Sequence, residues 1–440
     1  MPWSRLKVIL AISLPIMGGM VSQNILNLID IFFVRQLGDV ALAAAGISGF
    51  ASFTAVSIVL GFSTGVQAIV ARRYGEGQLK DMARPLNAGI VLALAFGIVL
   101  TLLLWYLTPV LFPLLNPDPA VQAAGIPYLQ VRLLGTVFLA INYSFRGYWN
   151  GIGRSGFYLT TLLIMHFANA VFNYVFIFGH WGAPELGLQG AAWGTSLAFM
   201  LGSCIYLVMG WHWSRPHGFL ASFPSWQEIQ LVLRISMPSS IQQLFFSAGI
   251  LAFHAIIGLI GTPELAASNI LINLLLVALL PGMGLGLAAA TLVGQAMGRK
   301  DLDDASRWAW QVAGVGLVFI AIIAAPMVFF PSDLLQPFSP DATILAIARL
   351  PLIMIGLYIP FDVVGVIFFH ALLGAGDSHR AMLVSLISQW LIFLPCAYLM
   401  GPIAGGSLAL VWALQCIYRL LQGGVYALLW RQKAWAKITF

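Results

Sequence analysis

Long apolar stretches recur along the whole of this 440-residue chain, and each is long enough to cross a bilayer core of about 30 Å. We expect helices, because a membrane barrel would show short strands of alternating hydrophobicity instead. With 60% hydrophobic and only 8% charged residues, the chain does not match a soluble domain. The predicted fold class is an all-α polytopic membrane protein, with about twelve spans at roughly 8–34, 44–71, 87–112, 122–145, 156–179, 189–210, 229–258, 265–294, 308–331, 345–372, 380–401 and 404–430.

The two halves of the chain repeat each other at a constant shift of 223 positions, without a gap between residues 12–75 and 235–298. The matched pairs are residues that set backbone geometry, such as Pro15 and Pro238, Gly61 and Gly284, Gly75 and Gly298, and Gly153 and Gly376. A duplicated membrane chain usually forms two packed halves with a site between them. We predict a parallel internal repeat, with an N-terminal lobe at 1–210, a cytoplasmic linker at 211–228 and a C-terminal lobe at 229–440.

Basic residues fall on alternate connections between the predicted helices. If the N-terminus with Arg5 and Lys7 is cytoplasmic, the opposite side receives Arg35 and little else, although Arg349 lies near one boundary. The cytoplasmic side receives Arg72, Arg73, Lys80, Arg84, Arg146, Arg154, Arg215, Arg299, Lys300, Arg307, Arg380, Arg431, Lys433 and Lys437. This asymmetry predicts that both termini are cytoplasmic. The net charge of +6 therefore reflects membrane topology and does not indicate nucleic-acid binding.

Two of the fifteen acidic residues, Asp30 and Asp362, lie well inside apolar stretches. An isolated ionised carboxylate there costs several kcal/mol, so each acid should face a wet cavity, be paired or carry a proton. For Asp362 a functional role and a buried structural hydrogen bond stay open. Arg419, also within a predicted helix, could snorkel or pair with a carbonyl, and we assign it no role.

The three cysteines have no metal-ligand spacing, so neither disulfides nor a metal site is expected.

Asp30 belongs to a polar stripe. Gln23, Asn27 and Asp30 share one face of the first helix, and Asn169 and Asn173 share one face of the fifth. The two stripes can converge into one hydrated pocket, although amides alone can also simply hold membrane helices together. An acid that is neutral when protonated and charged otherwise is a natural proton carrier, so we interpret Asp30 as functional.

The polar stripe is confined to the first half. The repeat places Phe253 at the position of Asp30, and Ile392 and Cys396 at those of the two asparagines. A one-sided polar insert in a duplicated scaffold points to a site. Pro15, which cannot donate to the carbonyl of Ala11, makes the first helix a candidate hinge, and a static kink is the alternative.

These features together resemble a known family. Pro15, then Asp30, then Gly38 with the Ala-rich run 41–45 is similar to the first helix of the multidrug and toxic compound extrusion (MATE) transporters. The glycine-containing turns at 150–155 and 373–378 resemble that family's repeated turns before helices 5 and 11. The resemblance runs the full length and implies two six-helix bundles that open alternately to each side of the membrane.

Within the family, the chain is most similar to the DinF branch, whose coupling site lies in the N-terminal lobe. The resemblance implies that Asp30, Asn169, Asn173, Gln23, Tyr128 and Thr195 are site residues, and Asn27 joins them from the stripe. Asp362 matches an acid that other branches use in the C-terminal lobe. Some relatives of the branch carry a second acid where this chain has Asn173, which argues against a strong sodium site because hard cations prefer several charged oxygen ligands.

The resemblance implies an antiporter that exports cationic or amphipathic drugs in exchange for protons, acting as a monomer in the bacterial inner membrane. No cofactor beyond the coupling ion and no nucleic-acid partner is expected. Sodium coupling and a flippase for lipids or lipid-linked precursors are the alternatives, the second of which would favour a cationic cavity. An enzyme is not expected, since no nucleophile with a base and no paired metal ligands occur at membrane depth. The 71–77 loop also lacks the basic motif typical of major facilitators.

Overall fold

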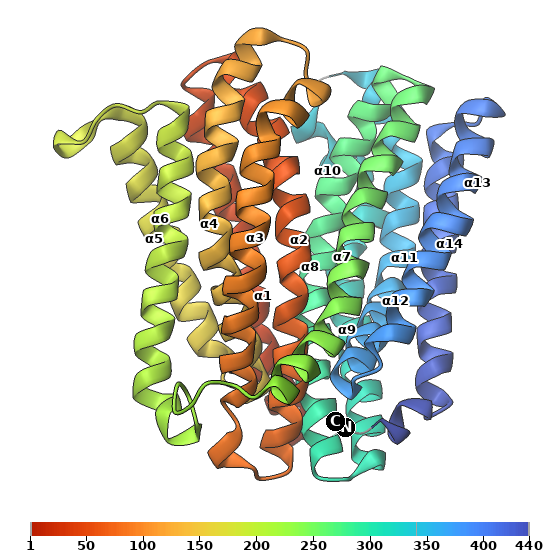
Figure 1. The fold of residues 1–440 in the computed structure, drawn as a ribbon. Coiled ribbons are helices and arrows are strands. Elements are labelled where there is room, and N and C mark those ends of the chain that lie inside the picture. Colours follow the sequence, from red (N-terminus) through yellow and green to blue (C-terminus); the bar gives the residue numbers. More distant parts are fainter. Residues whose placement is uncertain (1, 340, 439–440) are drawn as a thin grey trace. The chain divides into compact units, whose positions relative to one another are not determined.

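The computed structural model describes residues 2–339 and 341–438, which form helices and turns without a strand (Figure 1). Within this part of the chain, twelve helical stretches are long and apolar enough to cross a membrane, which confirms the predicted fold class. The first six are α1 (Trp3–Arg35), α2 (Asp39–Gly75), α3 (Arg84–Leu115), α4 (Pro119–Gly151), α5 (Ser155–Phe178) and α6 (Leu188–Met209). Five of the others are α7 (Trp226–Ile260), α8 (Thr262–Gly298), α9 (Leu302–Phe329), α11 (Ala342–Ala375) and α14 (Leu408–Arg431).

The eleventh span is composite. It consists of α12 (Ser378–Leu386), η6 (Ile387–Phe393), α13 (Leu394–Tyr398) and η7 (Leu399–Ile403), of which η6 and η7 are wider π-helical turns. Pro395 cannot donate to the carbonyl four residues earlier, so the backbone around it departs from regular α-helical hydrogen bonding. The short elements are η1 (Leu79–Asp81), η2 (His180–Gly182), η3 (Gly210–Ser214), η4 (Arg215–His217), α10 (Pro331–Leu335), η5 (Gln336–Phe338) and η8 (Ala434–Lys437).

Glycines end α4 and α11 in the same way. Gly153 has a φ of 75° and Gly376 a φ of 90°, a left-handed conformation that disfavours residues with a Cβ atom. The residue after each glycine donates its N–H to the carbonyl five positions earlier, over 2.9 and 2.8 Å. This pattern closes the open end of a helix. It explains why glycine occupies both repeat-related positions.

Two compact units are distinguished by the contacts among the described residues. One contains the chain up to Met17 together with everything from Leu244 onward, and the other contains Gly18–Gln243. The first half of α1 therefore belongs with the helices from α8 onward, and the first half of α7 belongs with α2 to α6. The lobes predicted at 1–210 and 229–440 stay a prediction, because they follow the repeat and not these contacts.

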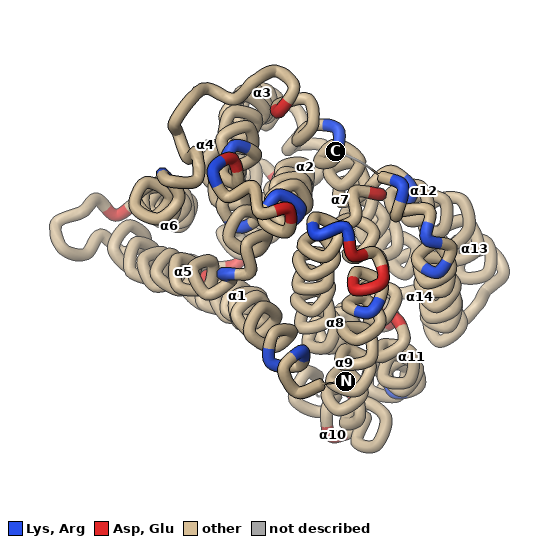
Figure 2. Tube along the Cα trace, turned by 90° about the horizontal axis from the view of Figure 1, so that it is seen from below, with Lys and Arg blue, Asp and Glu red and all other residues tan. Residues whose placement is uncertain are grey.

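Most charged residues lie on connections or in the terminal turns of helices, and Asp30, Arg132, Asp362 and Arg419 are exceptions inside spans. Figure 2, a view from below, shows many of the Lys, Arg, Asp and Glu positions on the connections that face the viewer. This distribution follows from the high cost of placing charge in hydrocarbon.

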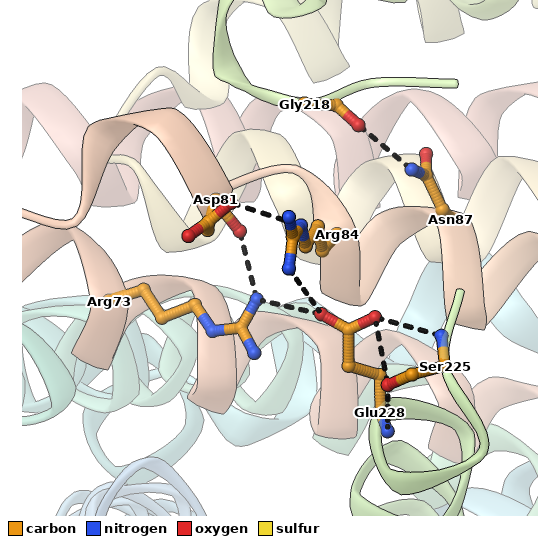
Figure 3. Close-up of polar contacts among 7 residues, drawn as sticks. All are labelled: Arg73, Asp81, Arg84, Asn87, Gly218, Ser225 and Glu228. Atoms are coloured by element: carbon orange, nitrogen blue, oxygen red, sulfur yellow. Dashed lines mark hydrogen bonds and ion pairs between the residues drawn. The ribbon is translucent and has the colours of Figure 1, made fainter. Parts of the chain in front are cut away.

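The predicted linker is more regular than expected. Two short helical elements, η3 and η4, continue from α6, and α7 already begins at Trp226. The side chain of Asn87 in α3 donates to the carbonyl of Gly218 over 2.9 Å and accepts from the N–H of Leu220 over 3.1 Å. The first of these bonds is visible in Figure 3. The linker is therefore fastened to the start of α3.

Candidate functional site

A chain of polar side chains joins α1, α5 and α6. Asn173 donates to Asp30 Oδ1 over 2.7 Å and lies 3.2 Å from Asn169, which in turn lies 3.1 Å from Thr195 Oγ1. Thr195 donates to the carbonyl of Ala191 over 3.0 Å and so is fixed on its own helix. The structure thus brings together four of the residues predicted from the sequence.

Close packing of α6 on α5 makes this chain possible. A Cβ atom at position 194 would lie 3.0 Å from the backbone nitrogen of Asn173, which is tighter than normal packing allows. Gly194 therefore lets the two helices approach. Asn169, Asn173 and Thr195 are 1%, 0% and 5% exposed, whereas Asp30 is partly exposed. The two asparagine amides are therefore buried, and the partly exposed Asp30 carboxylate packs against them.

The Asn169 amide can take two orientations that both keep its contact with Thr195. In one, Asn169 Nδ2 donates to Thr195 Oγ1 over 3.1 Å. After rotation by 180°, Asn169 Oδ1 accepts from the backbone N–H of Thr195 over 3.2 Å and Nδ2 donates to Asp30 Oδ1 over 3.0 Å. The second orientation gives Asp30 two amide donors, and such donors stabilise an ionised carboxylate.

The other end of the α1 stripe contacts a histidine that the sequence analysis missed. Gln23 donates to Asn27 over 3.4 Å, and its Oε1 lies 3.2 Å from His166 Nε2, while His166 Nδ1 lies 2.6 Å from Ser22 Oγ. Because an amide oxygen only accepts, Nε2 is the donor and Nδ1 accepts from Ser22. The spacing of His166 three and seven residues before the two asparagines places all three on one face of α5, and this signal was available in the sequence.

Tyr128 does not join the Asp30 chain and instead contacts a second missed residue. Arg132 Nη1 donates to Tyr128 Oη over 2.7 Å, one helical turn away on α4. Arg132 lies in the middle of a membrane span and takes part in none of the ion pairs formed by the described residues. Its charge nevertheless interacts with that of Asp30. Arg132 was not among the site residues predicted from the sequence.

Asp362, the candidate in the second half, is held by the arginine that had no assigned role. Arg419 Nε and Nη2 each lie 2.9 Å from a different oxygen of Asp362, and Nη1 donates to Gln422 over 3.0 Å. Gln422 continues to Ser388 in η6 over 2.5 Å. Asp362 is only 3% exposed. Both of its oxygens are engaged by the guanidinium, so it differs sharply from Asp30, whose described partners are neutral amides.

Pro15, the predicted hinge, lies inside an uninterrupted α1. His254 and His370, two other histidines within spans, each donate from Nδ1 to the carbonyl four residues earlier, over 2.9 and 2.8 Å. The bending of α1 at Pro15 stays a prediction.

Comparison with known proteins gives matches over the whole chain. The family model MatE matches residues 15–175 and again 238–399, so the two matched copies begin 223 positions apart. A probable multidrug resistance protein NorM of Agrobacterium fabrum is 30% identical over 92% of this chain and 89% of its own length. A protein of the same description from Thermotoga maritima is 28% identical over 90% and 85%. Among solved structures, a transporter of the MOP superfamily from Pyrococcus furiosus superposes with a TM-score of 0.89 at 20% identity, covering 99% of this chain and 97% of that one.

Proposed function

Because this chain belongs to the MatE family, and is therefore a multi-pass membrane transporter of the multidrug efflux type, we propose that it exports cationic or amphipathic compounds in exchange for protons, with Asp30 as the coupling carboxylate. The observation that carries the proposal is the 2.7 Å contact between this partly exposed acid and the buried amide of Asn173. An intramembrane acid held by neutral groups can change its charge without breaking an ion pair.

The protonation of Asp30 changes which hydrogen bonds the site can make. Ionised Asp30 accepts from Asn173, whose own buried Oδ1 has no hydrogen-bond partner among the described atoms. Once protonated, Asp30 becomes a donor, and a rotated Asn173 amide can offer it that oxygen. The two charge states thus favour two arrangements of α1 against α5. A proton drives transport only to the extent that it binds these two states unequally.

Three features favour protons over sodium. The polar neighbours of Asp30 are two neutral amides, whereas a hard cation such as sodium prefers several charged oxygen ligands. The positive charge of Arg132 interacts with Asp30 and opposes the entry of a further cation. In the second half, Asp362 is already occupied by Arg419. The branch within the family and the monomeric state expected from the sequence are part of the same proposal.

The hinge at Pro15 supplies the proposed mechanical link. Since proline has no N–H, the carbonyl of Ala11 lacks its regular helical partner, and α1 can bend there with little loss of hydrogen bonding. Asp30 lies on the same helix, fifteen residues further on. A change in how Asp30 contacts α5 is therefore transmitted to the segment beyond the proline.

The test is to replace Asp30 with Asn and to measure dye efflux in vesicles under separate proton and sodium gradients. We expect proton-driven efflux to fall by at least about fivefold, because the coupling free energy of 1–3 kcal/mol depends on the charge change. The matched control is Asp39→Asn, which removes an exposed acid at the start of α2. Proton-driven efflux of unchanged rate in the Asp30 variant would end the proposal, and efflux that follows only the sodium gradient would establish the sodium alternative.

Arg132 gives one reason to keep the flippase alternative. A cation in the middle of a span could meet the phosphate of a lipid headgroup. The same vesicles with a fluorescent anionic lipid distinguish the two functions, because a flippase would move the lipid between leaflets and leave the dye gradient unchanged.

A further inference from the structure

The chain passes between the two compact units at only two places, and both are inside proline-containing helices. α1 crosses between Met17 and Gly18, two residues after Pro15, and α7 crosses between Gln243 and Leu244, five residues after Pro238. The segments before these points, 3–17 and 226–243, are here called the arms. Each arm is grouped with one unit and the rest of its helix with the other.

Repeat-related glycines seat both arms. A Cβ at Gly61 in α2 would lie 2.5 Å from the backbone nitrogen of Ser240 in the second arm. A Cβ at Gly284 in α8 would lie 3.2 Å from the backbone nitrogen of Met17, the repeat counterpart of Ser240, in the first arm. Only glycine permits such close approach, and Gly61 and Gly284 are 223 positions apart. The two arms are therefore docked by the same contact, once in each unit.

An ion-pair cluster fastens the tip of the first arm to the corner between α8 and α9. Arg5 is paired with Asp304, which is also 3.0 Å from Arg299 Nη2 and accepts from Trp308 Nε1 over 2.9 Å. The Arg5 guanidinium lies 3.8 Å from the centroid of the Trp308 ring. We call these four residues the first clasp.

A second cluster fastens the tip of the other arm to the corner between α2 and α3 (Figure 3). Glu228 Oε1 lies 3.5 Å from Arg73 Nη1 and 4.0 Å from Arg84 Nη1, while its Oε2 accepts from the N–H of Ser225 over 3.1 Å. Asp81 completes the cluster, since it lies 3.0 Å from Arg84 Nε and its carbonyl accepts from Arg73 over 2.8 Å. Arg73, Arg84, Asp81 and Glu228 form the second clasp.

The two clasps occupy equivalent positions in the repeat, but the residues at the tips of their arms carry opposite charges. Position 5 corresponds to 228 and position 81 to 304, so arginine at the tip of the first arm is replaced by glutamate at the tip of the second. If an arm docked at the wrong corner, Arg5 would face Arg73 and Arg84, or Glu228 would face Asp304. Like charges at these positions disfavour the wrong pairing. The opposite charges of Arg5 and Glu228 therefore favour the observed pairing of each arm with its own corner.

We propose that the two clasps hold the arms at their corners in one stage of the transport cycle, and that the arms must leave them for the cycle to proceed. This proposal rests on the proposed function, since it concerns a step of transport. The pairs are partly exposed, with side-chain exposures of 18% and 22% for Arg5 and Asp304. Such a pair changes an equilibrium by only about two- to fivefold, which is enough to bias docking and weak enough to open in every cycle.

The experiment locks the first clasp covalently in the full chain. Arg5→Cys and Asp304→Cys are introduced after Cys204, Cys396 and Cys416 have been replaced by alanine, and a short bis-thiosulfonate reagent joins them in vesicles. We expect ethidium efflux to fall at least tenfold on cross-linking and to return when the link is reduced. The matched control is Lys433→Cys with Asp303→Cys, an exposed ion pair on the neighbouring residue of α9, for which we expect less than a twofold change.

Retained efflux in the cross-linked first-clasp variant, at the rate of the control, would overturn the proposal. Absence of ethidium efflux in the cysteine-free parent, with or without a proton gradient, would instead count against the proposed function. The yield of the cross-link between positions 5 and 304 tests the clasp independently of efflux. This yield should fall when a proton gradient and ethidium are supplied together. A complete yield under all conditions would show that the arm does not leave its corner.

Discussion

At the scale of single residues, Asp30 has a cationic neighbour that hydropathy alone does not identify. Arg132 is the cation whose charge interacts with Asp30, and it is tied to Tyr128 on its own helix. The positive charge of Arg132 favours the ionised form of Asp30 and opposes a second cation. A site of this kind should discriminate against inorganic cations more strongly than one with the acid alone.

We therefore predict that Arg132→Gln makes the transporter sensitive to sodium. Removing a positive charge lowers the repulsion of a second cation by roughly 1–2 kcal/mol, so sodium should inhibit proton-driven efflux at about a tenfold lower concentration. Arg132→Lys, which keeps the charge, should behave like the parent. Sodium titrations of dye efflux measure this directly, and identical inhibition curves for all three proteins would contradict it.

Residue types and helical spacing were sufficient to predict most of the polar chain. Asp30, Asn169 and Asn173 stood out because polar residues inside apolar stretches are rare, and their spacings of three and four placed them on common faces. The partners of Asp362 could not be predicted. Arg419 lies 57 positions away on another helix, and only the packing of α11 against α14 brings the two together. Tyr128 was expected at the same site as Asp30 and is instead bonded to Arg132.

At the scale of the helices, the Asp362–Arg419 pair acts as a bridge between α11 and α14. We predict that Arg419→Met destabilises the protein by about 3–5 kcal/mol, because it leaves a buried carboxylate without its counter-ion. The double variant Asp362→Leu with Arg419→Met removes both charges and should recover much of that loss. Thermal unfolding in detergent measures both effects. A double variant that is stable but cannot couple efflux to protons would assign Asp362 a role beyond structure.

The glycine seats of the arms give a second prediction for the helices. Gly61→Ala should destabilise the protein by about 1–3 kcal/mol, because its methyl group would meet the backbone of the second arm. Gly49→Ala, on the same helix with nothing within 4 Å of its Cβ position, should instead stabilise it by about 0.5–1 kcal/mol. The unfolding temperatures of the two variants, measured side by side, test this prediction. Equal unfolding temperatures would mean that the second arm is not closely packed against α2.

At the scale of the whole molecule, the alternation of basic connections predicts its orientation. Fluorescent protein fused to the C-terminus should be fluorescent and alkaline phosphatase fused there should be inactive, because both termini are expected in the cytoplasm. The same fusions at Gly182, between α5 and α6, should give the opposite result. Active phosphatase at the C-terminus would reverse the assignment of sides and with it the direction of proposed export.

The number of spans, the repeat and the family could all be predicted because they depend on features local to the sequence, namely apolar length and matched glycines and prolines. The grouping of each arm with the opposite unit could not be predicted. It depends on which neighbour each half-helix contacts, and hydropathy does not specify that neighbour. The clasps were also hidden, because their charges lie at helix ends, where charge is expected in any membrane protein.

The exchanged arms bear on what the peptide link between the halves contributes. A cut within residues 218–225 would produce two fragments, and each would carry a helical segment whose proper seat is on the other. Neither fragment could satisfy its glycine seat or its ion pairs alone. The two halves are thus connected by exchanged helical segments as well as by the peptide chain, as in a domain-swapped dimer.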